Sequence, residues 1–356
     1  MIGAITDDQP AARRPDLAET DDMALYRRDL LRVFGVVAAL LALPAAEAAQ
    51  DLAVLDDADD LDGYALLNSR LWDTFALTSA KATLRPVVDE QLQVLAAQLS
   101  DAASTSTRQK LCALAGDALQ LAGEIHFDTR DYSTAAHCYA MAAEASKAAN
   151  AYDQWACAVT RHAYISLYEG NFDDAAPMLD AAAKIARHGD PQLSTRYWVA
   201  AVQAETFAGQ NDLDRCRQAL DSAEGVLELH GPVHNGGWLR FDGSRLAEER
   251  GSCYATLGHL DLAESALLDA LQPDLSPRRC AGVQTDLAAI GAQRRDPDQV
   301  LHYATAVLAK ARKTRSGVIA SKLDNLRPHL APLLTNKKIA ALDSDIRILV
   351  GSSKTR

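Results

Sequence analysis

A short phrase of small and apolar residues returns five times along this chain and constrains its fold more than any other feature. In each copy a small residue lies twelve positions before a second compact residue, with a polar turn between them. The first members are Gly123, Ala163, Ala204, Gly251 and Ala288, and the second are Ala135, Ala175, Cys216, Ala263 and Val300. Two helices approach to about 8 Å only where side chains are small. The constant distance therefore predicts two antiparallel helices in each copy.

The spacing between copies indicates how these helix pairs are joined. Successive first members are 40, 41, 47 and 37 residues apart, so the linkers vary while the distance within a copy does not. Large residues begin the second helices and are expected to fill the gap at the turn, namely Tyr132, Phe172, Leu213 and Leu260. One pair leaves an apolar face open, so neighbouring pairs must stack to bury it.

The composition agrees with an all-α array. Alanine, the best helix former and a poor strand former, supplies 67 of the 356 residues, and only 6% of the residues are aromatic. This argues against a β-sandwich, a barrel or a disulfide scaffold. We predict five repeats over residues 108–315, an N-terminal helix pair over 51–107 and capping helices over 316–350. Residues 351–356 are expected to form a tail.

The N-terminal segment raises a question of targeting. Arg27 and Arg28 precede an apolar run from Val33 to Leu43, and the sequence Ala46-Glu47-Ala48 follows. This is the form of a twin-arginine export signal, and the alternative is a buried apolar helix within residues 23–50. Eleven apolar residues are fewer than the roughly twenty that a membrane span needs, so we expect no stable span. Residues 1–22 are polar and are expected to form a flexible tail.

Motifs for catalysis or metal binding do not stand out. The six cysteines lie at least nineteen residues apart in helical stretches, which predicts reduced, structural thiols. His230 and His234 are four apart, but Pro232 between them forbids a regular helix. The acidic cluster over 56–60 directly precedes an expected helix, where carboxylates cap free N–H groups. Nucleophile-elbow, phosphate-loop and dinucleotide motifs are missing, so we predict a non-enzymatic protein without cofactor or metal.

Charge is distributed unevenly along the chain. The net charge is −12, and residues 307–356 hold eleven Lys and Arg against three Asp and Glu, so the first 306 residues carry −20. The negative total argues against direct nucleic-acid binding. We expect the basic C-terminal segment to be a solvated helix surface, with a tail that has its own partner as the alternative.

The repeat and several longer phrases resemble a known family. The phrases are Leu275-Ser276-Pro277-Arg278-Arg279, Thr285-Asp286-Leu287-Ala288, Ala311 to Gly317 and Leu323 to Arg327. The helix pair resembles the tetratricopeptide repeat, and the phrases resemble the tetratricopeptide sensor region of actinobacterial helix-turn-helix transcriptional regulators, over about residues 60–350. The resemblance implies a right-handed superhelical solenoid of antiparallel helix pairs, acting inside the cell. About twenty-five residues precede Arg27, too few for the family's DNA-binding domain, so a sensing or docking module is expected.

The functional surface is expected to be the concave groove lined by the first helices. By repeat register, the groove residues are Asp117, Gln120, Glu124, Asp128, Thr160, Arg161, Tyr164, Tyr168, Trp198, Glu205, Arg245, Glu248 and Ser252. Such an acidic and aromatic lining suits an extended peptide that carries Lys or Arg. We predict a peptide or partner protein as ligand and leave the oligomeric state open, a homo-oligomer included. The expected location is the cytoplasm, with export through residues 27–48 as the alternative.

Overall fold

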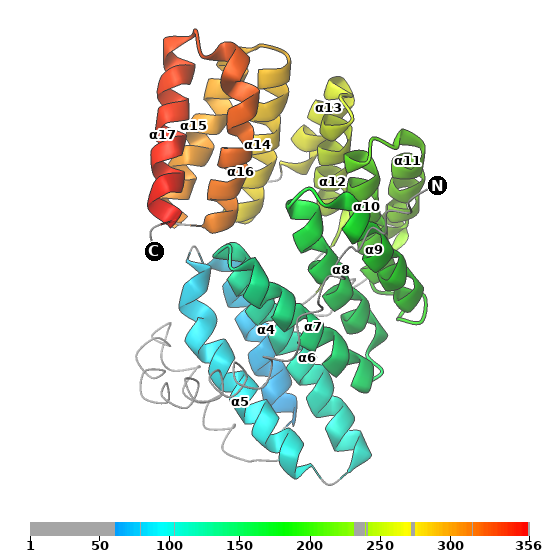
Figure 1. Cartoon of the computed structure of the whole chain (residues 1–356). Coiled ribbons are helices and arrows are strands. Elements are labelled where there is room, and N and C mark those ends of the chain that lie inside the picture. The colour runs from blue at the N-terminus through cyan, green and yellow to red at the C-terminus, as the bar shows by residue number, and fades with distance from the viewer. Residues whose placement is uncertain are drawn as a thin grey trace, which may run out of the picture.

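The structure is a computed structural model that describes residues 61–78, 80–102, 104–230, 239, 241–271, 275–314 and 316–354. Every regular element in these ranges is a helix, so the all-α prediction is confirmed (Figure 1). The apolar run, the acidic cluster over 56–60 and His234 lie outside the described residues. Antiparallel helix pairs stack side by side as a solenoid. The handedness of its superhelix stays a prediction.

Helix pairs occupy the region in which the repeats were expected. They are α6 (Thr105–Asp128) with α7 (Tyr132–Ala148), α8 (Tyr152–Tyr168) with α9 (Phe172–Ala186), α10 (Thr195–Gly209) with α11 (Leu213–Ala223), α12 (Gly243–Thr256) with α13 (Leu260–Ala270), and α14 (Pro277–Gln293) with α15 (Pro297–Thr314). Before them lie α4 (Leu61–Leu77), the 3₁₀ turn η1 (Lys81–Leu84) and α5 (Arg85–Asp101). The remaining elements are η2 (Glu224–Glu228), α16 (Gly317–Leu330), η3 (Ala331–Leu333) and α17 (Lys337–Lys354).

All five turns within the pairs share one backbone conformation. Seven residues after each first small residue, the backbone enters the left-handed region, with positive φ at Arg130, Gly170, Asn211, Gly258 and Arg295. The next N–H then donates to a carbonyl five residues earlier, as from Asp131 to His126 and from Asp296 to Gly291. This hydrogen bond ends the first helix in a Schellman motif. The repeat is therefore a repeat of geometry as well as of residue type.

The small residues lie where the two helices of a pair meet. Ala163, Ala175 and Ala204 have no exposed surface. A Cβ atom added to Gly123 would lie 2.4 Å from a ring carbon of Tyr139. Since real Cβ atoms do not approach so closely, glycine is the residue that this contact requires. The prediction that small residues permit close helix pairing is confirmed.

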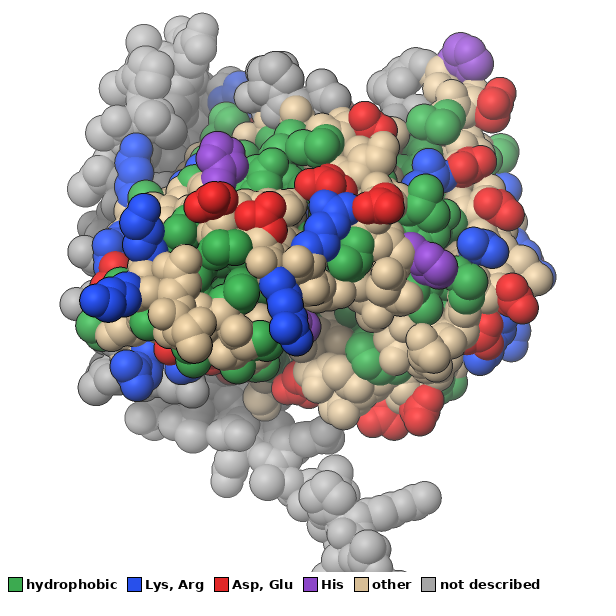
Figure 2. All heavy atoms as spheres, turned by 90° about the horizontal axis from the view of Figure 1, so that it is seen from above, with side chains coloured by type: hydrophobic (Ala, Val, Ile, Leu, Met, Phe, Trp, Pro, Cys, Tyr) green, Lys and Arg blue, Asp and Glu red, His purple; other side chains and the backbone are tan. Residues whose placement is uncertain are grey.

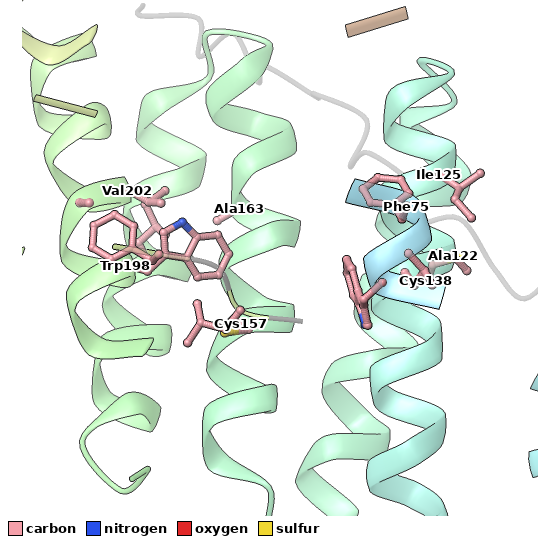
Figure 3. Packing of buried hydrophobic residues seen from close by; sticks show 14 of the residues in the cluster. Phe75, Ala122, Ile125, Cys138, Cys157, Ala163, Trp198 and Val202 are labelled. Atoms are coloured by element: carbon pink, nitrogen blue, oxygen red, sulfur yellow. The ribbon is translucent and has the colours of Figure 1, made fainter. Parts of the chain in front are cut away.

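The two largest clusters of buried residues form separate cores, and smaller clusters fill other helix contacts. The first joins α4 to α12, and Figure 3 shows part of it, with Trp198 and Val202 beside Ala163, and Phe75 beside Ile125. The second lies within α14–α17, which we call the C-terminal block. This block packs its own apolar helices around residues such as Leu323 and Ile339.

The array curves back until the C-terminal block meets the first repeat. The Ser316 hydroxyl, which caps α16, donates to Asp128 Oδ1 over 2.7 Å, although the two residues are 188 positions apart. A Cβ on Gly317 would lie 2.4 Å from the carbonyl oxygen of Asp128. We call this contact between α6 and α16 the seam. It brings the first helices of successive pairs around a common interior.

Candidate ligand-binding inner wall

Polar and aromatic side chains from the first helices of successive pairs contact one another around this interior. We call this set the inner wall. Its members are Glu124, Asp128, Arg161, Tyr164, Tyr168, Trp198, Glu205, Arg245, Glu248, Glu249, Arg278, Arg279, Asp286 and Lys322. They come from α6, α8, α10, α12, α14 and α16, because helical periodicity returns side chains to one face every three or four residues.

Glu124 of α6 holds the first cluster of the inner wall together. Its Oε1 lies 3.4 Å from Arg161 Nε, and its Oε2 lies 3.8 Å from Arg278 Nη1. The Tyr139 hydroxyl donates to the same carboxylate over 2.9 Å. Arg161 lies between two indole rings, with its guanidinium carbon 5.1 Å from the ring centre of Trp198. Cation–π contact on both sides fixes this arginine between α4 and α10.

Glu248 of α12 is the centre of a second cluster. Its Oε2 accepts from Arg245 Nη1 over 2.9 Å, and its Oε1 accepts from Arg279 Nε over 2.7 Å. Arg245 also lies 3.5 Å from Glu249. These charge-assisted bonds connect α12 to α14.

Two glutamates face each other between these clusters. Burial raises the pKa of Glu205 well above its ordinary value, and the charge of Glu249 and a hydrogen bond with it raise it further. The protonated form of Glu205 is therefore favoured more strongly than that of an exposed glutamate. The Tyr164 hydroxyl donates to Glu205 over 3.2 Å, which binds α8 to α10.

Lys322 and Asp286 form the ion pair between α14 and α16, with 3.3 Å between Nζ and Oδ2. Burial raises the pKa of Asp286, and the charge of Lys322 only partly offsets it. Burial lowers the pKa of Lys322, but the neighbouring acids outweigh this and leave it above the ordinary value. Nearby, the Tyr168 hydroxyl donates to the Val318 carbonyl over 3.4 Å, across the seam.

Five residues expected in an open groove are instead buried, and for these the predicted exposure to the groove is wrong: Asp117, Gln120, Asp128, Thr160 and Trp198. Asp117 accepts from Trp72 Nε1 over 2.7 Å inside the contact between α4 and α6, and burial raises its pKa to about 6. Gln120 is fully buried and accepts from Arg161 Nη1 over 2.6 Å. Asp128 is closed off by the seam, and the Thr160 hydroxyl donates to a carbonyl of its own helix. The side chains of Arg161, Arg245 and Glu248 remain partly exposed.

The charge of the lining also differs from expectation. Arg278, Arg279 and Lys322 join the wall from α14 and α16, where no groove residue was predicted, and they balance the acids. In the second cluster the cations are the more exposed partners, at 27% for Arg245 and 26% for Arg279 against 12% for Glu248. Cationic tips therefore lie above a deeper carboxylate in the second cluster, whereas in the first cluster Glu124 is more exposed than Arg161, at 20% against 11%.

A sequence signal for part of this set was available. Glu249 and Asp286 lie two positions before Gly251 and Ala288, and Arg161 lies two positions before Ala163. Applying that offset to every copy would have found both acids. Lys322 could not be found in this way, because α16 lacks the repeated phrase.

Figure 2 shows acidic, basic and hydrophobic side chains intermixed on the face seen from above. In the described ranges, His, Cys, Asp and Glu do not gather in threes as a metal site would need. The helices placed by the structure include none with the length and apolar character of a membrane span.

Comparisons with known proteins give little further guidance. Neither a protein-family model nor a curated protein matches the chain. Among solved structures, a Rap protein complexed with competence and sporulation factor is similar over 83% of this chain and 99% of its own, with 11% identity and a TM-score of 0.47. The apo form of RapI is similar over 93% and 98%, with 11% identity and a TM-score of 0.40. Scores this low carry no argument, so the function must be argued from this chain's residues.

Proposed function

We propose that this chain is a non-enzymatic helical-repeat module that binds a peptide or a partner segment against its inner wall. The observation that carries the proposal is the convergence of partly exposed ionic side chains from α8, α12, α14 and α16. An apolar core of similar volume is often as stable as buried ion pairs, or more stable. Folding alone therefore gives no reason to place such a network in the interior, whereas ligand recognition does.

The lining suits a ligand rich in carboxylates. Arg245, Arg279 and Lys322 are 26–32% exposed, and each retains N–H groups beyond those used in its ion pairs. Arginine and lysine donors of this kind form charge-assisted hydrogen bonds with Asp, Glu or a terminal carboxylate. The partly exposed ring of Tyr164 supplies flat apolar surface beside them. We therefore favour an acidic peptide over the basic peptide that the sequence suggested.

A regulatory role follows from the family resemblance. The phrases Leu275–Arg279, Thr285–Ala288, Ala311–Gly317 and Leu323–Arg327 resemble regulator sensor regions, and the first two supply Arg278, Arg279 and Asp286 of the inner wall. A module that changes its contacts when a peptide binds would serve such a sensor, and the cytoplasm remains the expected location.

Selection from a random-peptide display library tests this proposal. Enriched peptides would be labelled, and their affinity for the full chain measured by fluorescence polarisation. We expect Asp- and Glu-rich peptides to be enriched. Replacing Arg279→Gln together with Lys322→Gln should weaken their binding by about tenfold or more, because two charge-assisted contacts are lost.

A matched control keeps the same residue types. Arg312→Gln with Lys338→Gln removes one arginine and one lysine from exposed positions on α15 and α17. This variant should bind within about twofold of the wild type, and thermal melts would establish that both variants fold. Failure to enrich any peptide, or equal affinity in the two double variants, would contradict the proposal.

A further inference from the structure

A small pocket opens where the seam joins the two ends of the array. It is partly open to solvent, encloses about 10 Å³, which is room for about one oxygen-sized group, and is lined by Thr78, Lys81, Pro277, Arg278, Thr314, Ser316 and Ile319. We call it the seam pocket. Thr78 and Lys81 lie between α4 and α5, whereas the other residues belong to the C-terminal block. Any group bound here would touch both ends of the array.

The charged side chains that line the pocket are both cations. Arg278 lies 3.7 Å from Asp128 and 3.8 Å from Glu124, but across the described part of the chain its guanidinium makes no hydrogen bond. Its five N–H groups therefore have only the longer ion-pair contacts with these carboxylates. The side chain is 23% exposed. A guanidinium with unused donors in a pocket is a ready partner for an oxyanion.

Lys81 provides the second positive charge. It is 6% exposed, and its ammonium group donates to the carbonyls of Phe75 and Ala76 at the end of α4. Burial and then the charge of Arg278 lower its pKa to about 8, while Asp128 and Glu124 partly compensate. A bound anion would relieve the repulsion between the two cations, because it would lie near both.

The helix N-termini and the hydroxyl-bearing residues at the pocket also favour an anion. The helices α14 and α16 both begin at the pocket, capped by Ser276 and Ser316, and the first turn of a helix favours negative charge. Thr78, Thr314 and Ser316 line the same space, and the Ser316 hydroxyl donates to Asp128. Asp128 and Glu124 do not line the pocket, although their charges act on both Arg278 and Lys81.

We propose that the seam pocket binds an oxyanion, a carboxylate or a phosphate group, and that the bound anion ties the C-terminal block to the N-terminal helices. The ligand contacts are Arg278 and Lys81 with the hydroxyl of Thr78. Ser316 keeps its bond to Asp128 and closes the back of the pocket. This site uses no peptide on the inner wall, so it stands or fails separately from the proposed function.

Thermal melting of the full chain in added anion tests the site. Sodium phosphate, acetate and an N-acetylated amino acid would be titrated separately against sodium chloride of equal ionic strength. An anion that binds the folded state alone raises Tm in a saturable way. We expect such a rise with at least one of the three, and the strongest response identifies the group as phosphate or carboxylate. A chloride-like response to all three overturns the proposal.

Variants locate the effect in the pocket. Arg278→Gln should weaken the apparent anion affinity by about tenfold or more, and Arg312→Gln on the exposed face of α15 should leave it unchanged. Because Arg278→Gln also disturbs Asp128, Thr78→Val serves as a second variant that removes a hydroxyl and no charge. It should weaken anion binding by severalfold whether or not the first variant folds. An unchanged response in Thr78→Val or in folded Arg278→Gln overturns the assignment.

Discussion

The turns within the helix pairs are alike in every copy, whereas the side chains of the inner wall differ from copy to copy. Each turn repeats one geometry, with a left-handed residue seven positions after the small residue in all five pairs. The inner wall repeats only a helix face, and its contents change from Glu124 and Arg161 to Glu205 and Lys322. Contacts between neighbouring residues and small side chains determine the first region. Charges contributed by distant parts of the chain determine the second.

This difference separates what makes the array from what it can recognise. The pair interfaces are apolar and closely packed, so their stability comes from burial and van der Waals contact. The inner wall places carboxylates and guanidinium groups in partial burial, where ion pairs contribute little or nothing to stability. We therefore expect the pair interfaces to govern folding and the inner wall to govern ligand choice. The following measurements test that division.

The largest effect should come from a pair interface. Ala175→Arg inserts a long charged side chain where α8 and α9 meet and where Ala175 has no exposed surface. Overpacking and an unpaired buried charge should cost more than about 4 kcal/mol and unfold the array locally. Ala181→Arg, on the exposed face of the same helix, should change stability by less than about 0.5 kcal/mol. Urea unfolding followed by circular dichroism measures the free energy of unfolding of both variants. Equal values would contradict the expected difference between the pair interface and the exposed face.

The next effect should appear in the pH dependence of stability. Burial raises the pKa of Asp117 to about 6, so folding favours its protonated form. The stabilisation that protonated Asp117 gives the folded state is fully present below its unfolded pKa of about 4. It is lost as the pH rises through 6. Asp117→Asn removes this loss, so the variant should gain up to about 3 kcal/mol relative to wild type between pH 4 and pH 7.

Urea titrations at several pH values measure this gain. The exposed Asp221→Asn variant on α11 provides the control, because it removes an acid without touching the contact between Trp72 and Asp117. Parallel stability curves for wild type and Asp117→Asn would show that Asp117 does not titrate in this range.

A smaller effect should come from the inner wall. Glu248→Ala leaves Arg245 and Arg279 without the carboxylate that joins them and should cost about 2 kcal/mol. Glu248→Gln keeps one of the two acceptor oxygens and fills the same space, so it should cost less. The exposed pair Arg312–Asp345 is the reference, and Arg312→Ala should cost less than about 0.5 kcal/mol. Chemical denaturation that ranks Arg312→Ala above Glu248→Ala would remove the distinction between inner and outer ion pairs.

The smallest effect should come from a turn. Arg295 is exposed and has a φ of 58°, a conformation that glycine adopts without strain. Arg295→Gly should stabilise the chain by about 0.5 kcal/mol, because relief of backbone strain exceeds the added entropy of the unfolded state. Gly170→Ala, at the same position of the second repeat, should destabilise it. Thermal melts that shift both variants in the same direction would contradict the shared turn geometry.

The sequence predicted the pair geometry because every determinant of it is local. Gly123 and Ala135 lie only twelve residues apart, so the contact between their helices can be predicted from a short stretch of sequence. The polar turn between them marks where the chain reverses. The inner wall was predicted only in part. Register placed Glu124, Arg161 and Glu205 on the helix faces that form the inner wall, but it could not show that Asp117 meets Trp72 or that Arg278 meets Asp128. Those contacts depend on how far the stack curves, and curvature accumulates from small rotations at each interface.

The hydrogen bond between Ser316 and Asp128 joins the two ends of the array and so changes how its repeats support one another. In an open row of repeats, each unit affects only its neighbours, and the row can be shortened from either end one unit at a time. Here the last helices rest on the first repeat, so trimming one terminus withdraws support from the other. Such a chain should lose its structure in fewer and larger steps than its number of repeats suggests, and a disturbance at either end should reach the opposite one without crossing the middle.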